Sequence, residues 1–136
     1  MKYITGQHAL NLPCSLMTSG DWHKSALQWE FPFCRDSRDS VFGDYGIEHN
    51  ISIPEHKGTY DVANHIRALL DLLEMGRFTA AQGMNKDYIC NDKYTTDEIF
   101  GQVSKLYDYP LWSQIDCFMG GEYYAEWLEY KKTRGL

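Results

Sequence analysis

The sequence predicts an α+β fold, in which a small antiparallel sheet is covered by four or five helices. Up to residue 58, apolar side chains alternate with polar ones, which is typical of strands. Beyond that point they recur at every third or fourth position, which is typical of amphipathic helices. The sheet is therefore assigned to roughly the first 55 residues. Because 136 residues suit one ordinary domain, we expect residues 1–136 to form a single α+β domain.

The clearest strand signal is ALQWEFPF at residues 26–33, where four large apolar side chains alternate with smaller or polar ones. Pro32 cannot donate a ladder hydrogen bond, so we expect it at the end or edge of that strand. The stretch VFGDYGIEH at residues 41–49 is expected to pair with it as a hairpin with a long loop. A weaker first strand is predicted at residues 8–12, HALNL, from the same alternation.

The clearest helix signal is TYDVANHIRALLDLLEMG at residues 59–76. It has an apolar stripe on one face and a polar stripe on the opposite face. The apolar stripe comprises Val62, Ile66, Leu69 and Leu73, and the polar stripe comprises Asn64, Arg67, Asp71 and Glu74. We expect Thr59 or Asp61 to cap this helix and Gly76 to end it.

Further helical segments are predicted after residue 76. They are a short helix at residues 78–84 and longer ones at residues 95–107, 110–119 and 122–132. Gly120-Gly121 is expected to separate the last two helices, because glycine is a poor helix former.

The charge and hydropathy of the chain exclude some partners. The formal net charge is −6, whereas proteins that bind nucleic-acid backbones present a basic face, so we do not expect a nucleic-acid partner. No apolar run approaches the ~20 residues needed to span a bilayer, and the N-terminus lacks the apolar segment of a signal peptide. We therefore expect a cytoplasmic protein without a membrane partner. In that reducing compartment Cys14, Cys34, Cys90 and Cys117 are expected to be buried free thiols.

Metal and cofactor motifs are missing from the sequence. The cysteines and histidines lack the paired spacing of structural zinc sites, and no glycine-rich phosphate-binding motif occurs. We therefore expect no metal and no cofactor. The stretch GIEHNISIPEH at residues 46–56 repeats Glu-His, but neighbouring side chains on a strand point to opposite faces. A polar strand end followed by a solvated loop explains it more simply than a ligand site.

The stretch TSGDWHKSALQW at residues 18–29 raises the question of a catalytic loop, because it holds an acid, a histidine and two serines. Turn chemistry explains it more simply. Ser19-Gly20-Asp21 is expected to form a turn, with Trp22 packed beneath it and a strand beginning a few residues later.

One functional hypothesis is a small hydrolase or nuclease-like enzyme that uses a His/Asp/Glu cluster on the N-terminal sheet. It predicts that the candidate side chains converge in one pocket with perturbed pKa values. The candidate catalytic residues are His23, Asp21, Asp44, Glu48 and His49. A cysteine nucleophile, either Cys14 or Cys34 with His23 as base, needs only spatial proximity and stays open.

The preferred hypothesis is a non-enzymatic protein-interaction module, such as an inhibitor, an antitoxin-like protein or an adaptor. It rests on the lack of a strong catalytic motif, the acidic charge and the crowding of aromatic residues into residues 107–130. Tyrosine and tryptophan are favoured at interfaces, so we expect another protein, or a second copy of the chain, as partner. The candidate partner-binding residues, expected to be exposed together, are Tyr123, Trp127, Tyr130 and Trp112. The alternative is that these rings belong to the core.

Several stretches of the chain carry a resemblance to other proteins. They include MKYITG at residues 1–6, ALNLPCSL at 9–16, GDWH at 20–23 and ALQW at 26–29. FGDYGIEHN, VANHIRALLDLL and YICNDKY continue it along most of the chain. In these stretches the sequence resembles a family of small uncharacterised bacterial proteins. The resemblance implies a bacterial, cytoplasmic protein, and it implies no fold, activity or catalytic residue.

Overall fold

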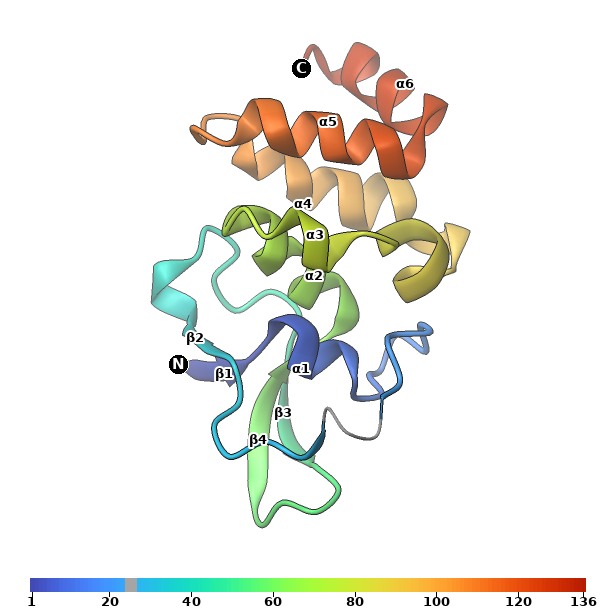
Figure 1. Ribbon diagram of the computed structural model, residues 1–136. Helices are drawn as coiled ribbons and strands as arrows, with labels where there is room; N and C mark the ends of the chain where they lie inside the picture. Colours follow the sequence, from blue (N-terminus) through green and yellow to red (C-terminus); the bar gives the residue numbers. More distant parts are fainter. Residues whose placement is uncertain (24–26) are drawn as a thin grey trace.

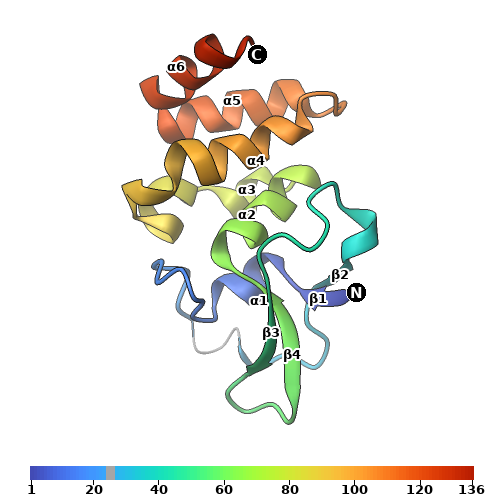
Figure 2. The ribbon, with the colours of Figure 1, turned by 180° about the vertical axis from the view of Figure 1, so that it is seen from behind.

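A computed structural model describes residues 1–23 and 27–136 and confirms the α+β class (Figure 1). The sheet lies at one end of the molecule, and the helices are stacked away from it in successive layers, as both opposite views show (Figures 1 and 2). The strands are β1 (Lys2–Ile4), β2 (Cys34–Asp36), β3 (Ile47–Ser52) and β4 (Thr59–Ala63), in the spatial order β2-β1-β4-β3.

The sheet joins two antiparallel strand pairs through one parallel contact. β1 pairs with β2, with Lys2 opposite Asp36, and β3 pairs with β4, with Ser52 opposite Thr59. β1 and β4 run parallel and meet at Ile4 and Val62. The sheet is therefore mixed, and it extends to residue 63, a little beyond the predicted end.

The strand predicted at residues 26–33 is absent from residues 27–33, which the structure describes; its first residue, Ala26, lies outside the described part. Side-chain contacts hold this segment instead of a neighbouring strand. The ring of Trp29 stacks on His56 at a centroid distance of 3.8 Å, and the Phe33 amide donates to His8 Nδ1 at 2.7 Å. The alternation of apolar residues thus reflects packing of a loop, and Phe31 is left exposed.

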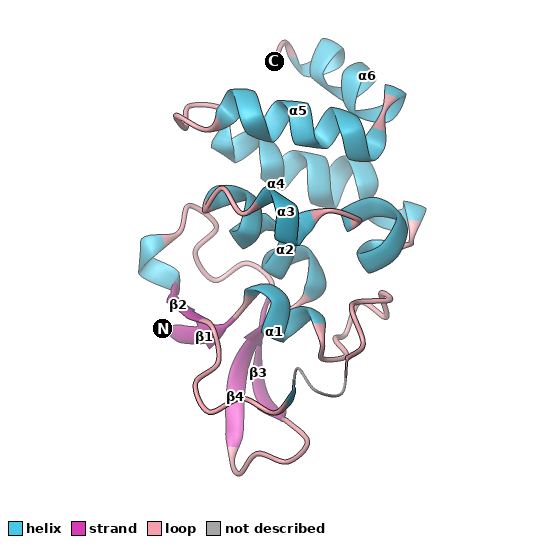
Figure 3. Cartoon of the chain, viewed as in Figure 1, coloured by secondary structure: helices cyan, strands magenta, loops and turns pink. Residues whose placement is uncertain are grey.

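Two other predicted strands differ from the structure. Residues 8–12, predicted as a strand, fall largely in helix α1 (Gly6–Leu10). Residues 41–46 are turns, and only the end of the stretch 41–49 enters β3. The hairpin is formed by β3 and β4, so part of the predicted long helix is strand (Figure 3). β-branched and aromatic residues in Thr59–Ala63 fit this strand.

The helix predicted from residue 59 begins later, as α2 (His65–Glu74). Its N-cap is Asn64, whose side chain accepts a hydrogen bond from the Arg67 amide at 2.8 Å, so the predicted caps Thr59 and Asp61 are wrong. Its end near Gly76 is confirmed, because that glycine has the left-handed φ of 75° that terminates helices. α2 is buried on almost all sides, although its sequence is amphipathic.

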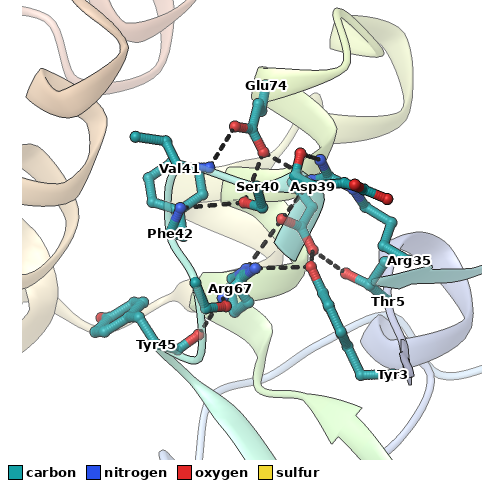
Figure 4. A network of polar contacts seen from close by, with 12 residues as sticks. Tyr3, Thr5, Arg35, Asp39, Ser40, Val41, Phe42, Tyr45, Arg67 and Glu74 are labelled. Carbon is teal, nitrogen blue, oxygen red and sulfur yellow. Dashed lines mark hydrogen bonds and ion pairs between the residues drawn. The ribbon is translucent and has the colours of Figure 1, made fainter. Parts of the chain in front are cut away.

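The polar stripe of α2 faces the sheet and forms a buried network of hydrogen bonds (Figure 4). The carboxylate of Asp71 accepts hydrogen bonds from the hydroxyls of Tyr3 at 2.8 Å and Thr5 at 2.7 Å. It also accepts from Arg67 Nε at 3.0 Å and from Arg35 Nη1 at 2.8 Å. A single carboxylate therefore ties α2 to β1 and β2.

The two arginines are balanced by a second carboxylate and by backbone carbonyls. Arg67 Nη1 donates to the carbonyl oxygens of Gly43 and Tyr45, each at 2.6 Å. Arg35 Nη1 also donates to Glu74 at 2.8 Å. The buried Arg67 and the partly buried Arg35 thus face the buried Asp71 and the partly buried Glu74, so each charge has a partner of opposite sign.

The C-terminal half forms the helical layers above α2. Its helical segments are α3 (Phe78–Ala81), η3 (Met84–Ile89), η4 (Asp92–Tyr94), η5 (Thr95–Phe100), α4 (Gly101–Val103), η6 (Ser104–Leu106), α5 (Trp112–Tyr123) and α6 (Ala125–Arg134). In the described residues, no helix combines the length and apolar character needed to cross a membrane. The predicted break at Gly120-Gly121 is wrong: α5 continues through both glycines and ends before Tyr124, which has a φ of 52°.

Most of the predicted partner-binding aromatics lie in the core of this half. The exposed fractions of Trp127, Tyr123 and Tyr130 are 0%, 2% and 8%. Their rings surround Phe100, with the centroid of Trp127 at 5.2 Å, and Trp112 packs against Trp127 while partly buried. The prediction that these residues are exposed together is therefore wrong. These rings are the part of the hydrophobic core that lies among the C-terminal helices.

We expect Asp71→Asn to lower the free energy of unfolding by about 3–5 kcal/mol, because it leaves the buried Arg67 guanidinium without its carboxylate partner. Urea unfolding followed by circular dichroism measures the change. Arg38→Gln is the control, since Arg38 is 83% exposed and pairs with Asp36 at the surface; its effect on the free energy of unfolding is expected to be much smaller. Equal losses for the two variants would contradict a central role for the buried carboxylate.

Candidate thiol–imidazole site

A thiol and an imidazole meet at the N-terminus of α2. Thr18 Oγ1 lies 3.6 Å from Cys14 Sγ and 2.6 Å from His65 Nδ1, so one hydroxyl contacts both groups. His65 is the first residue of α2, so the Thr18 hydroxyl links the sulfur to the N-terminus of that helix. The thiol thus lies against the first turn of a helix, where backbone N–H groups favour a negative charge.

The imidazole is buried and held in one orientation. Its Nε2 is hydrogen-bonded to the carbonyl oxygen of Leu12, which can only accept, so Nε2 carries a hydrogen. Nδ1 is therefore the nitrogen that exchanges a proton with Thr18 and Cys14. Gly20 packs directly against the same ring. Residues of one loop, 11–23, thus contact His65 on several sides.

The electrostatics of the pair favour an ionised thiol. Burial alone would raise the pKa of Cys14, but the hydrogen bonds and charge of His65 lower that pKa to about 7. Burial alone would lower the pKa of His65, but Cys14, the Leu12 carbonyl and the charge of Glu48 together raise it. Near neutral pH a thiolate and an imidazolium therefore stabilise each other.

The loop that carries Cys14 is fastened at several points to the rest of the protein. The Gly20 amide donates to the Tyr88 carbonyl at 2.8 Å, and the Asp21 amide donates to the Leu10 carbonyl at 2.7 Å. Tyr94 donates its hydroxyl hydrogen to the Leu16 carbonyl at 3.1 Å. These contacts hold the thiol in place without a neighbouring strand.

The residues proposed as catalytic from the sequence fall into separate contacts. Asp21 and His23 form an ion pair at 3.0 Å on the loop, while His49 pairs with Asp61 at 2.9 Å. Glu48 binds the residue that follows Cys14, and Asp44 is exposed in the turn before β3. Within residues 1–23 and 27–136, no hydrogen bond or ion pair joins the Asp21–His23 pair to Asp44, Glu48 or His49.

The loop itself differs in part from its predicted form. The predicted turn at Ser19-Gly20-Asp21 is wrong, because residues 17–23 form an irregular segment in which Gly20 has a left-handed φ of 68°. The prediction that Trp22 packs beneath this turn is wrong, because its exposed fraction is 61%. His65 was absent from the predicted site, and Cys14 was paired with His23 instead. The only local signal for His65 is its place directly after the helix-capping Asn64.

The four cysteines differ in environment. All are free; Cys14 and Cys34 are partly buried, whereas Cys90 and Cys117 are exposed, so the prediction of four buried thiols is wrong. Burial raises the pKa of Cys34, in contrast to Cys14. Reactivity at neutral pH is therefore expected to concentrate at Cys14 relative to Cys34.

Comparison with protein-family models, with curated proteins and with solved structures gives no match to this chain. In the parts of the chain that the structure describes, no three His, Cys, Asp or Glu side chains are grouped so that they could hold a metal ion. The chemistry of the site must therefore be argued from the thiol, the imidazole and their neighbours.

We expect Gly20→Ala to raise the pH midpoint of Cys14 alkylation. A Cβ at this position would lie 2.6 Å from the Leu10 carbonyl oxygen and 2.7 Å from His65 Cε1, so the ring would be displaced. Without the imidazole, the thiol pKa returns toward its ordinary value of about 8.5. The rate of reaction with iodoacetamide at each pH, followed by mass spectrometry of the Cys14 peptide, measures the midpoint.

Gly43→Ala is the matched control for this variant. Gly43 also has a positive φ, 52°, but an added Cβ there would meet nothing within 4 Å. The control shares the backbone strain and lacks the clash with His65. If both variants left the midpoint at its wild-type value, packing of Gly20 against the ring would have no influence on the thiol.

Proposed function

We propose that the protein is a thiol-dependent enzyme in which Cys14 attacks an acyl group and His65 transfers the proton. One observation carries this proposal: a buried imidazole is fixed by the Leu12 carbonyl with its other nitrogen directed through Thr18 to a thiol. A nucleophile, a base and a group that orients the base are the parts that covalent catalysis by cysteine requires.

The proposed reaction begins with the thiolate–imidazolium pair. Cys14 Sγ bonds to the carbonyl carbon of an ester, amide or thioester, and the bond to the leaving group breaks. The proton on His65 Nδ1 passes to the leaving group through the hydroxyl of Thr18, which leaves an acyl thioester on Cys14 and a neutral imidazole. Water then attacks the thioester and gives its proton to His65, which releases the acid and restores the pair.

The half-buried thiol is compatible with such chemistry in a reducing compartment. A thiolate near neutral pH is susceptible to oxidation, and cytoplasmic reductants keep it reduced. This chemistry supports the cytoplasm as the compartment that we propose for the protein. Of the residues considered from the sequence, Cys14 is the nucleophile in this proposal, His65 replaces His23 as the base, and Glu48 contacts the loop from β3.

We expect p-nitrophenyl acetate to acetylate Cys14 and to release nitrophenol in a burst, because an activated ester needs little substrate recognition. Cys14→Ser is expected to lose the adduct. His65→Gln is expected to slow the burst by about 100-fold or more, the usual contribution of a positioned base. Glutamine can still donate to Leu12 and accept from Thr18, so it keeps the contacts and loses the titratable group.

Cys90→Ser and Cys117→Ser serve as controls, since both thiols are exposed and neither belongs to the site. Both variants are expected to give the wild-type burst. Acetylation at Cys90 or Cys117 instead of Cys14, or a wild-type burst from His65→Gln, would overturn the proposed enzyme.

A second candidate function is the protein-interaction module. The exposed apolar residues that support it differ from the aromatic residues predicted from the sequence. Three of the large apolar side chains that are most exposed lie within residues 17–31: Met17 at 87%, Trp22 at 61% and Phe31 at 83%. Exposed apolar residues on one segment suit docking to another protein or to a second copy of the chain. This surface would replace Tyr123, Trp127 and Tyr130, which are buried.

We expect Trp22→Ser combined with Phe31→Ser to abolish binding to the physiological protein partner or self-association. Affinity capture followed by mass spectrometry, together with sedimentation velocity, measures both. Tyr124→Ser combined with Leu128→Ser is the matched control, because these exposed apolar residues lie at the other end of the chain. A partner lost with the control pair and kept with the first pair would contradict this surface.

A further inference from the structure

We propose that Glu48 is a positioning residue of the thiol–imidazole site, which holds the Cys14 loop and supplies the negative charge that balances the His65 imidazolium. This inference rests on the proposed function, since it concerns the same nucleophile and base. Glu48 lies on β3 and contacts the Cys14 loop at Ser15.

The geometry of Glu48 fixes the residue next to the nucleophile. Its Oε2 accepts a hydrogen bond from the Ser15 amide at 3.0 Å and another from the Ser15 hydroxyl at 2.5 Å. A carboxylate that receives two hydrogen bonds from one residue restrains both its backbone and its side chain. Because Ser15 follows Cys14 directly, the restraint also limits where the sulfur can move.

Charge gives Glu48 a second effect on the site. Cys14 from the loop and Glu48 from β3 both raise the pKa of the His65 imidazole. The two hydrogen bonds to Ser15 hold the Glu48 carboxylate next to the loop that contacts this ring.

The strand position of Glu48 explains why it reaches the loop and its neighbour does not. Neighbouring side chains on a strand point to opposite faces. Glu48 accordingly reaches Ser15, while His49 bonds to Asp61 on β4 at 2.9 Å. The Glu-His repeat in the sequence thus contributes one carboxylate to the site, and its histidine belongs to the hairpin.

Glu48→Gln tests the charge separately from the hydrogen bonds. The glutamine carbonyl oxygen can still accept from the Ser15 amide and hydroxyl, so the loop keeps its anchor while the charge is removed. We expect the pH midpoint of Cys14 alkylation to rise by about half a unit or more, since removal of an opposite charge nearby destabilises the imidazolium. Ser15→Ala, which keeps the charge and the amide contact, is expected to leave the midpoint unchanged.

Glu55→Gln is the control for net charge, because Glu55 is exposed in the turn between β3 and β4. A midpoint that shifts equally in Glu55→Gln and Glu48→Gln, or that does not shift in Glu48→Gln, would overturn the role of Glu48. The acyl adduct with p-nitrophenyl acetate separates the two proposals. If Glu48→Gln shifts the midpoint but the wild-type protein forms no adduct, the proposed enzyme is refuted and the positioning role of Glu48 stands. If the wild-type protein forms the adduct but Glu48→Gln does not shift the midpoint, the enzyme stands and the role of Glu48 is refuted.

Discussion

The buried carboxylate of Asp71 is the constraint on which the rest of the structure depends. It sits between two guanidinium groups, one from its own helix and one from β2, and it also receives hydroxyls from β1. A charge removed from water is stable only when every partner is in place. The network therefore fixes the depth and rotation of α2 against the sheet, and with it the position of every other group on that helix.

The thiol–imidazole site follows from the placement of α2. His65 is the first residue of this helix, and Asp71 lies less than two turns further along it. The Thr18 hydroxyl joins the His65 imidazole to the Cys14 sulfur, and Gly20 of the same loop packs against the ring. A network that stabilises the fold thus also fixes the helix that carries the base.

The periodicity of apolar residues along the sequence was sufficient to predict the class of the fold and most of the helices, because it indicates which face of an element is buried. It was insufficient for residues 27–33, where alternation arises from a Trp29–His56 stack and not from a sheet. The polar stripe of α2 was also misleading, since the sequence does not distinguish a solvated face from a buried ionic network.

The candidate site could not be predicted from local pattern for a related reason. Cys14 and His65 come from different elements, and the packing of the loop on α2 brings them together. Aromatic composition was equally ambiguous, because Trp127 and its neighbours lie in the hydrophobic core and not on a surface. In both cases the deciding quantity is three-dimensional proximity, for which composition and spacing carry little information.

The shared anion of Asp71 also restricts how this chain can evolve. A neutral residue at that position would leave Arg67 without a carboxylate partner and Arg35 with Glu74 alone, so Arg35 and Arg67 are expected to change with it in the same lineage. The hydroxyls of Tyr3 and Thr5 would then lose their acceptor as well. These five positions should therefore covary among related sequences. Residues in the exposed loops around them should vary independently of one another.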